Sequence, residues 1–81
     1  MLKAGDILIA KEEIKMYDRL TFIKGKRYKV KETYIRKILD DNYYYFIVDS
    51  EWLENMNISF EALDKFDILR DIRKQKLEKL L

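Results

Sequence analysis

The stretch Phe22-Ile23-Lys24-Gly25-Lys26-Arg27-Tyr28-Lys29-Val30 decides how this chain begins to fold. A glycine stands between two lysines, and glycine readily adopts the left-handed backbone that tight turns require. From Arg27 onward basic and apolar residues alternate, so Tyr28 and Val30 point to one side of a strand and the basic residues to the other. The stretch therefore predicts a turn that leads into a β-strand with one buried and one basic face.

A second strand is predicted after the turn-forming residues 40–42. Six consecutive aromatic or β-branched residues, Tyr43-Tyr44-Tyr45-Phe46-Ile47-Val48, have the composition of a strand. The two strands together predict a long hairpin. The alternation slips after Glu32, which indicates a bulge or bend near Glu32–Thr33.

Weaker patterns predict the remaining elements. They are a short apolar strand at 7–10, a partly packed loop at 11–21, a short strand at 58–60, one tight helical turn at 61–65, a closing strand or helix start at 66–69, and a helix from Arg70 to Leu81.

Composition limits the chain to one small folded domain. Of its 81 residues 48% are hydrophobic and 14% aromatic, which is enough for a core, although the length is near the lower limit for one. Lys and Arg exceed Asp and Glu by five in residues 1–40 and by three in residues 65–81, whereas residues 41–64 hold six acidic residues and no Lys or Arg. An acidic, aromatic segment thus lies between two basic ones.

The segments F-I-K-G-K-R-Y-K-V and Y-Y-F-I-V-D, the latter at Tyr44–Asp49, resemble a broad group of small SH3-like barrels, many of them from phages and mobile elements. The similarity covers residues 5–69, with residues 58–66 as its last part. It implies a mainly β fold, a five-stranded SH3-like barrel over residues 1–69, followed by a helix over 70–81. It also implies a small phage-type protein that binds and inhibits a host enzyme or defence complex. The long segment 11–21 and the tail from Arg70 depart from the group's minimal pattern.

The sequence contains no recognisable set of catalytic residues. The chain has no His and no Cys, so the commonest general base, the thiol nucleophile and the usual zinc ligands are missing. Ser50 and Ser59 lack the surroundings of a serine nucleophile, and the paired acidic residues fit turns and strand ends. We therefore expect no enzyme, no cofactor and no metal site.

Protein binding is the function that we favour. Trp52 lies in an acidic stretch, and aromatic residues are favoured where proteins bind each other. The candidate contact residues are Tyr43, Tyr45, Glu51, Trp52 and Glu54. An equally good interpretation is that Trp52 covers one end of the core. The helix offers a second surface for a partner or a homodimer through Ile72, Leu77, Leu80 and Leu81.

Nucleic-acid binding is the alternative. Its candidate residues are Lys24, Lys26, Arg27, Lys29 and Lys31, with tyrosines nearby as stacking platforms. The acidic segment argues against it, because Lys–carboxylate pairs across the hairpin would use part of the positive charge. No signal peptide and no run of transmembrane length is recognisable, so we expect no membrane partner and a cytoplasmic location, in the host if a phage encodes the protein.

Overall fold

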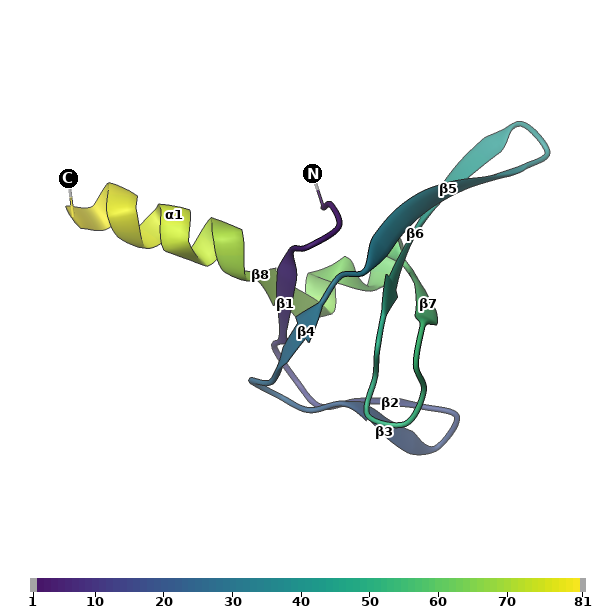
Figure 1. Ribbon diagram of the computed structural model, residues 1–81, viewed down its shortest axis with the longest axis horizontal. Helices are drawn as coiled ribbons and strands as arrows, with labels where there is room; N and C mark the ends of the chain where they lie inside the picture. Colours follow the sequence, from purple (N-terminus) through teal and green to yellow (C-terminus); the bar gives the residue numbers. More distant parts are fainter. Residues whose placement is uncertain (1, 81) are drawn as a thin grey trace.

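The computed structural model describes residues 2–80, without the side chains at 75 and 77–80. It confirms a mainly β protein with a C-terminal helix (Figure 1). The elements are β1 (Ile7–Ala10), β2 (Ile14–Met16), β3 (Arg19–Phe22), β4 (Arg27–Lys29), β5 (Glu32–Ile38), β6 (Asp41–Val48), β7 (Met56–Ser59), the 3₁₀ helix η1 (Phe60–Lys65), β8 (Phe66–Ile68) and α1 (Leu69–Leu80).

The strands lie in three antiparallel sheets rather than in one closed barrel. Their orders are β4-β1-β8, β2-β3 and β5-β6-β7. Only Val30 and Lys31 separate β4 from β5, so one nearly continuous strand passes from the first sheet into the third. The irregularity predicted near Glu32–Thr33 is present: Lys31 N–H donates to Ile47 O at 2.8 Å although the residue paired with Ile47 is Glu32, so two residues of this strand face one residue of β6. The described part of the chain has eight short strands where the sequence predicts five.

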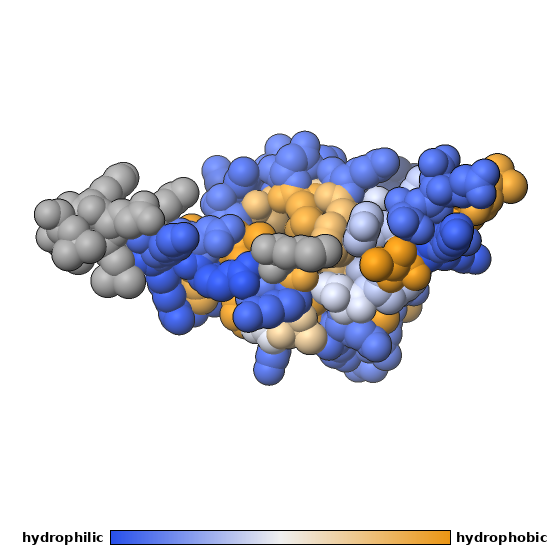
Figure 2. All heavy atoms as spheres, turned by 90° about the horizontal axis from the view of Figure 1, so that it is seen from above, coloured by the Kyte–Doolittle hydropathy of each residue, from blue (hydrophilic) through white to orange (hydrophobic). Residues whose placement is uncertain are grey.

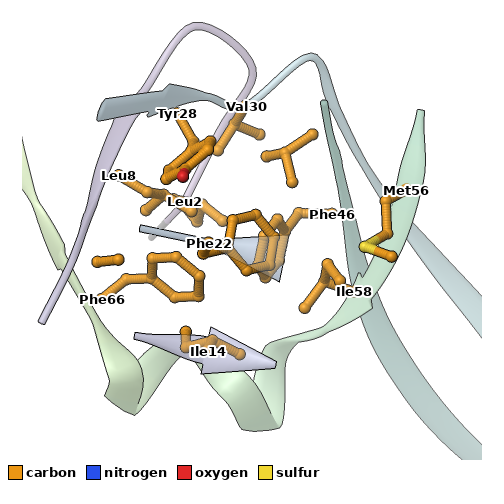
Figure 3. Packing of buried hydrophobic residues seen from close by; sticks show 12 residues of the cluster. Leu2, Leu8, Ile14, Phe22, Tyr28, Val30, Phe46, Met56, Ile58 and Phe66 are labelled. Carbon is orange, nitrogen blue, oxygen red and sulfur yellow. The ribbon is translucent and has the colours of Figure 1, made fainter. Parts of the chain in front are cut away.

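The core lies where the sheets face each other. Phe22 sits in its centre, edge-on to Tyr28 and Phe66 with ring centroids 4.8 and 5.1 Å away (Figure 3). Phe46 and Val30 are fully buried beside it. The four aromatic residues come from four different strands and Val30 from the link between β4 and β5, so burying them holds the sheets together.

The turn before β4 is formed as the sequence predicts. Gly25 has φ +80°, and its N–H donates to Ala10 O at 2.8 Å. No neighbouring atom would meet a side chain at Gly25, so the backbone angle alone accounts for glycine here. Tyr28 then points into the core and Arg27 and Lys29 point outward.

Residues 11–21 do not form the predicted loop. Most of them belong to the β2–β3 hairpin, whose two-residue turn is Tyr17–Asp18 with φ of 55° and 60°. Two positive φ angles define the turn type that matches the twist of a hairpin. Thr21 holds the hairpin together, because its buried hydroxyl donates to Arg19 O at 3.0 Å and accepts from Met16 N–H at 3.1 Å.

Two projections give the molecule its extended shape of 46 × 32 × 18 Å. The β5–β6 hairpin stands out on one side and α1 on the other (Figure 1). The helix starts at Leu69, one residue before its predicted first residue. Near its start Arg70 lies 3.4 Å from the buried carboxylate of Asp6, which joins the helix to the segment before β1.

Candidate protein-binding surface

The outer half of the β5–β6 hairpin exposes large apolar side chains. We call residues 35–44 the hairpin arm. It holds five of the large hydrophobic residues that are exposed in the described structure: Ile35, Ile38, Leu39, Tyr43 and Tyr44. Leu39 at the tip is 91% exposed and has φ +56°, an unusual backbone angle for a branched side chain. The backbone angle of Leu39 belongs to the turn between β5 and β6, whereas the exposure of the five apolar side chains is not explained by the protein's own core.

An apolar groove opens at the base of the hairpin arm. It has a volume of about 390 Å³ and is lined by Leu2, Tyr44, Phe60, Leu63 and Ile68. Tyr44 comes from the arm and Phe60 from η1, with ring centroids 5.7 Å apart. From above, an apolar area occupies the middle of the molecule between α1 and the arm, with hydrophilic surface around it (Figure 2). We call the hollow lined by Leu2, Tyr44, Phe60, Leu63 and Ile68 the apolar groove.

The structure splits the protein-binding residues that the sequence predicts into two groups. Tyr43 and Tyr45 lie on β6, on the face of the hairpin opposite to the buried Phe46. Tyr45 is half-buried and stacks on Tyr34 with centroids 5.3 Å apart, and Tyr34 donates to Asn57 Oδ1 at 3.0 Å. Glu51, Trp52 and Glu54 lie at the other end of β6, in the loop before β7. The five residues therefore do not form one site.

Trp52 covers an end of the core. Its indole N–H donates to Thr21 Oγ1 at 3.1 Å, which fixes the loop after β6 against β3. The guanidinium of Arg19 lies 5.0 Å from the centre of its ring, and Tyr17 meets it edge-on at 6.3 Å. Trp52 is half-buried among these neighbours, while Tyr17 is 83% exposed at the hairpin turn.

Glu51 belongs to a structural network. Its carboxylate forms an ion pair with Lys26 and accepts a hydrogen bond from Tyr28 Oη at 2.8 Å. Tyr28 Oη in turn accepts from Ile23 N–H at 2.7 Å. The hydrogen bond from Lys26, followed by that from Tyr28, lowers the pKa of Glu51. Burial, followed by the hydrogen bond to Glu51, raises the pKa of Tyr28 to about 12.

The basic residues of the nucleic-acid alternative are partly neutralised. Lys26 is paired with Glu51, and Lys31 lies 2.8 Å from Asp49, whose pKa it lowers through that hydrogen bond. Asp49 also accepts from Asn55 N–H at 2.9 Å. Lys24, Arg27 and Lys29 are exposed and make no ion pair within the described residues. The predicted pairing of the acidic segment with the basic strand is thus present.

The helix residues proposed for a partner are only partly visible. Ile72 is half-buried near the start of α1. Leu77 and Leu80 belong to the helix, but their side chains lie outside the described part, and Leu81 lies outside it altogether. No helix among the described residues combines the length and the apolar composition needed to cross a bilayer.

Sequence reasoning did not find the apolar groove or the tip of the hairpin arm. The sequence holds one signal for the exposed tip: the apolar residues Ile35, Ile38 and Leu39 do not keep the alternation of Tyr28 and Val30. The groove carries no such signal, because it combines Leu2, β6, η1 and β8 from distant parts of the chain. Comparisons of the chain with protein-family models, curated proteins and solved structures give no match.

Proposed function

We propose that this protein is a non-enzymatic module that binds another protein through the apolar groove and the hairpin arm. The observation that carries the proposal is the concentration of exposed apolar side chains on the arm beside an apolar hollow. Ile35 is paired opposite Tyr44 and shares its face of the hairpin, whereas Ile38 and Tyr43 lie on the other face. Exposed apolar residues next to an apolar groove are typical of surfaces that a partner covers. Surfaces of this composition bind protein segments whose apolar side chains can enter the hollow.

Tyr44 is the expected centre of the binding surface. It links the arm to the groove, since its ring lies beside Phe60 while its strand continues into the exposed tip. Tyrosine contributes much contact area at small conformational cost and keeps a hydroxyl for a hydrogen bond. The tip beyond it, with Leu39 exposed, can reach along a partner's surface.

The strand connections support the assignment to an open SH3-like fold. If β4 and β5 are taken as one bent strand, the neighbours run β8-β1-β4/β5-β6-β7, with the β2–β3 hairpin inserted after β1. On the resemblance described above, the proposed partner is a host enzyme or defence complex that the protein inhibits. A fold of this kind serves many purposes, so the partner has to be identified experimentally.

The test is capture of the partner by the full chain, followed by titration of the purified partner. Tyr44→Ser and Leu63→Gln alter two walls of the groove, and each is expected to weaken binding at least about tenfold. Leu53→Glu is the matched control, because Leu53 is also exposed but lies in the loop after β6. Thermal melting establishes that all variants are folded. Unchanged affinity in both groove variants, or an equal loss in Leu53→Glu, contradicts the proposed site.

A further inference from the structure

The outer edge of β5 is open to another strand. β5 is the first strand of the sheet β5-β6-β7 and pairs, within the described residues, with β6 alone. The free edge begins at Glu32, because the preceding Val30 is already engaged: its N–H donates to Asp6 O and its C=O accepts from Gly5 N–H, both at 2.8 Å. The hairpin stands clear of the rest of the molecule (Figure 1).

Apart from its charged side chains, this edge lacks the features that normally prevent strand pairing. It is seven residues long, and the chain contains no proline. Its ladder to β6 is regular from Glu32 to Ile38, and the irregularity at Lys31 lies just before this free edge. Tyr34 leans across β6 toward Asn57 and leaves the backbone of β5 accessible. The strand carries three charged residues, Glu32, Arg36 and Lys37. A second copy of the strand can place Glu32 near Arg36, so that these two charges compensate each other.

We propose that two copies of this chain pair antiparallel through β5, with the twofold axis at Ile35. A twofold axis that relates antiparallel strands is perpendicular to the sheet, so one residue lies opposite its own copy. With Ile35 at the axis, the seven residues of β5 all find partners and pairing stops at Glu32, where the free edge begins. Tyr34 then lies opposite Arg36 of the second copy, and Glu32 lies diagonal to the same arginine, within reach of long side chains.

Neighbouring registers are less favourable. An axis at Arg36 sets two arginines directly opposite each other, and like charges in that position are destabilising. An axis at Tyr34 extends the pairing to Val30, whose N–H and C=O already have partners. Ile35 is 59% exposed and is therefore free to meet its copy.

In the proposed dimer the two apolar grooves lie on the same side of the joined sheet. Residues opposite each other in a sheet share a face, so the two copies carry their core-facing sides, and with them Tyr44 and the groove, on the same side of the joined sheet. Two grooves on one side allow a partner with two equivalent segments to be bound more tightly than one groove allows. This consequence rests on the proposed function, whereas the dimer itself does not.

Disulfide trapping tests the register, because the chain has no cysteine of its own. In Ile35→Cys the two new thiols face each other with Cα atoms about 4.5–5.5 Å apart, a distance that a disulfide can span. In the control Lys37→Cys, on the same face of β5, the axis at Ile35 places the two Cα atoms about 14 Å apart, too far to be bridged.

Both variants are oxidised as full chains, and the dimer fraction is followed on a non-reducing gel. We expect Ile35→Cys to cross-link at least about ten times faster than Lys37→Cys. Sedimentation of the wild type is expected to show a dimer that grows with concentration, and Ile35→Lys is expected to remove it by opposing two ammonium groups at the axis. Equal cross-linking rates, faster cross-linking of Lys37→Cys, or a wild-type protein that is monomeric at every concentration tested overturns the proposal.

Discussion

Tyr28 connects three parts of the chain through one hydroxyl group. Its oxygen accepts from Ile23 N–H in the turn before β4 and donates to Glu51 after β6, while its ring packs on Phe22 in the core. The sequence places Tyr28 on the buried face correctly, but alternation alone cannot show that its hydroxyl reaches Glu51, 23 residues further along. The segment Lys24–Lys26 thus supports the fold by leading into Tyr28, two residues further along.

Removing this hydroxyl is expected to lower stability and to change its dependence on alkaline pH. Tyr28→Phe leaves Ile23 N–H without its acceptor and should lower the free energy of unfolding by about 1–2 kcal/mol. In the wild type the pKa of Tyr28 is raised from 10.0 to about 12, so the folded state favours the protonated phenol. That stabilisation is complete below pH 10 and is lost as the pH rises from about 10 to about 12.

Urea unfolding at a series of pH values measures both effects. The loss of stability between about pH 10 and pH 12 is expected to be smaller in Tyr28→Phe than in the wild type, by at most about 2–3 kcal/mol. The same alkaline loss in both proteins contradicts the role given to Tyr28.

Thr21 holds the same loop after β6 through the neighbouring residue Trp52. Its buried hydroxyl accepts from Met16 N–H and from the Trp52 indole N–H, both at 3.1 Å. Thr21→Val keeps the shape but leaves both donors without an acceptor, so the free energy of unfolding should fall by about 2–3 kcal/mol. Thr21→Ser keeps the hydroxyl and loses one methyl group, with an expected cost of about 1 kcal/mol. Denaturant unfolding compares the two, and an equal cost in both variants argues against the hydrogen bonds.

At the scale of elements, the long hairpin could be predicted because its strands are rich in β-favouring residues. Its turn is Leu39–Asp40 and not the predicted 40–42, because Asp41 and Asn42 already pair with Ile38 and Lys37 as the first residues of β6. The β2–β3 hairpin could not be predicted, since its turn uses Tyr17–Asp18 instead of the Asn-Gly or Asp-Gly pairs that mark such turns. The pattern was nevertheless present, with Ile14 and Met16 alternating before the turn and Leu20 and Phe22 after it. Tertiary contacts through Thr21 and Trp52 outweigh the weak local preference.

The hairpin should be locally less stable toward its tip. β7 pairs with β6 only from Tyr45 to Val48, so the sheet has three strands there and two strands from Asp41 to Tyr44. Two-stranded ribbons are marginally stable in water. Amide hydrogen exchange of the dilute protein is therefore expected to be at least about tenfold faster in residues 36–43 than in residues 45–48. Uniform protection along β6 at low concentration would contradict this expectation.

At the scale of the whole molecule, the acidic segment 41–64 partly compensates the basic segment before it. Two acidic residues after β6 form ion pairs with lysines on either side of β4: Asp49 with Lys31 and Glu51 with Lys26. The sequence predicts this pairing because the two strands are adjacent, and the structure contains it. The apolar groove could not be predicted, because it depends on how η1 and the N-terminal segment pack against β6, and packing between distant segments has no periodic pattern.

This compensation predicts weak binding to nucleic acid. Of the five basic residues proposed for that function, only Lys24, Arg27 and Lys29 make no ion pair among the described residues. If these three each neutralise one phosphate, the logarithm of the association constant for single-stranded DNA should fall against the logarithm of salt concentration with a slope of about −2. Fluorescence anisotropy of a labelled oligonucleotide across a salt series measures this slope. Lys29→Ala should make the slope shallower, whereas Lys26→Ala should leave it nearly unchanged, because Lys26 is already neutralised by Glu51. A wild-type slope well beyond −2 that becomes shallower in Lys26→Ala would show that Lys26 exchanges Glu51 for phosphate, and it would restore the basic strand as a nucleic-acid site.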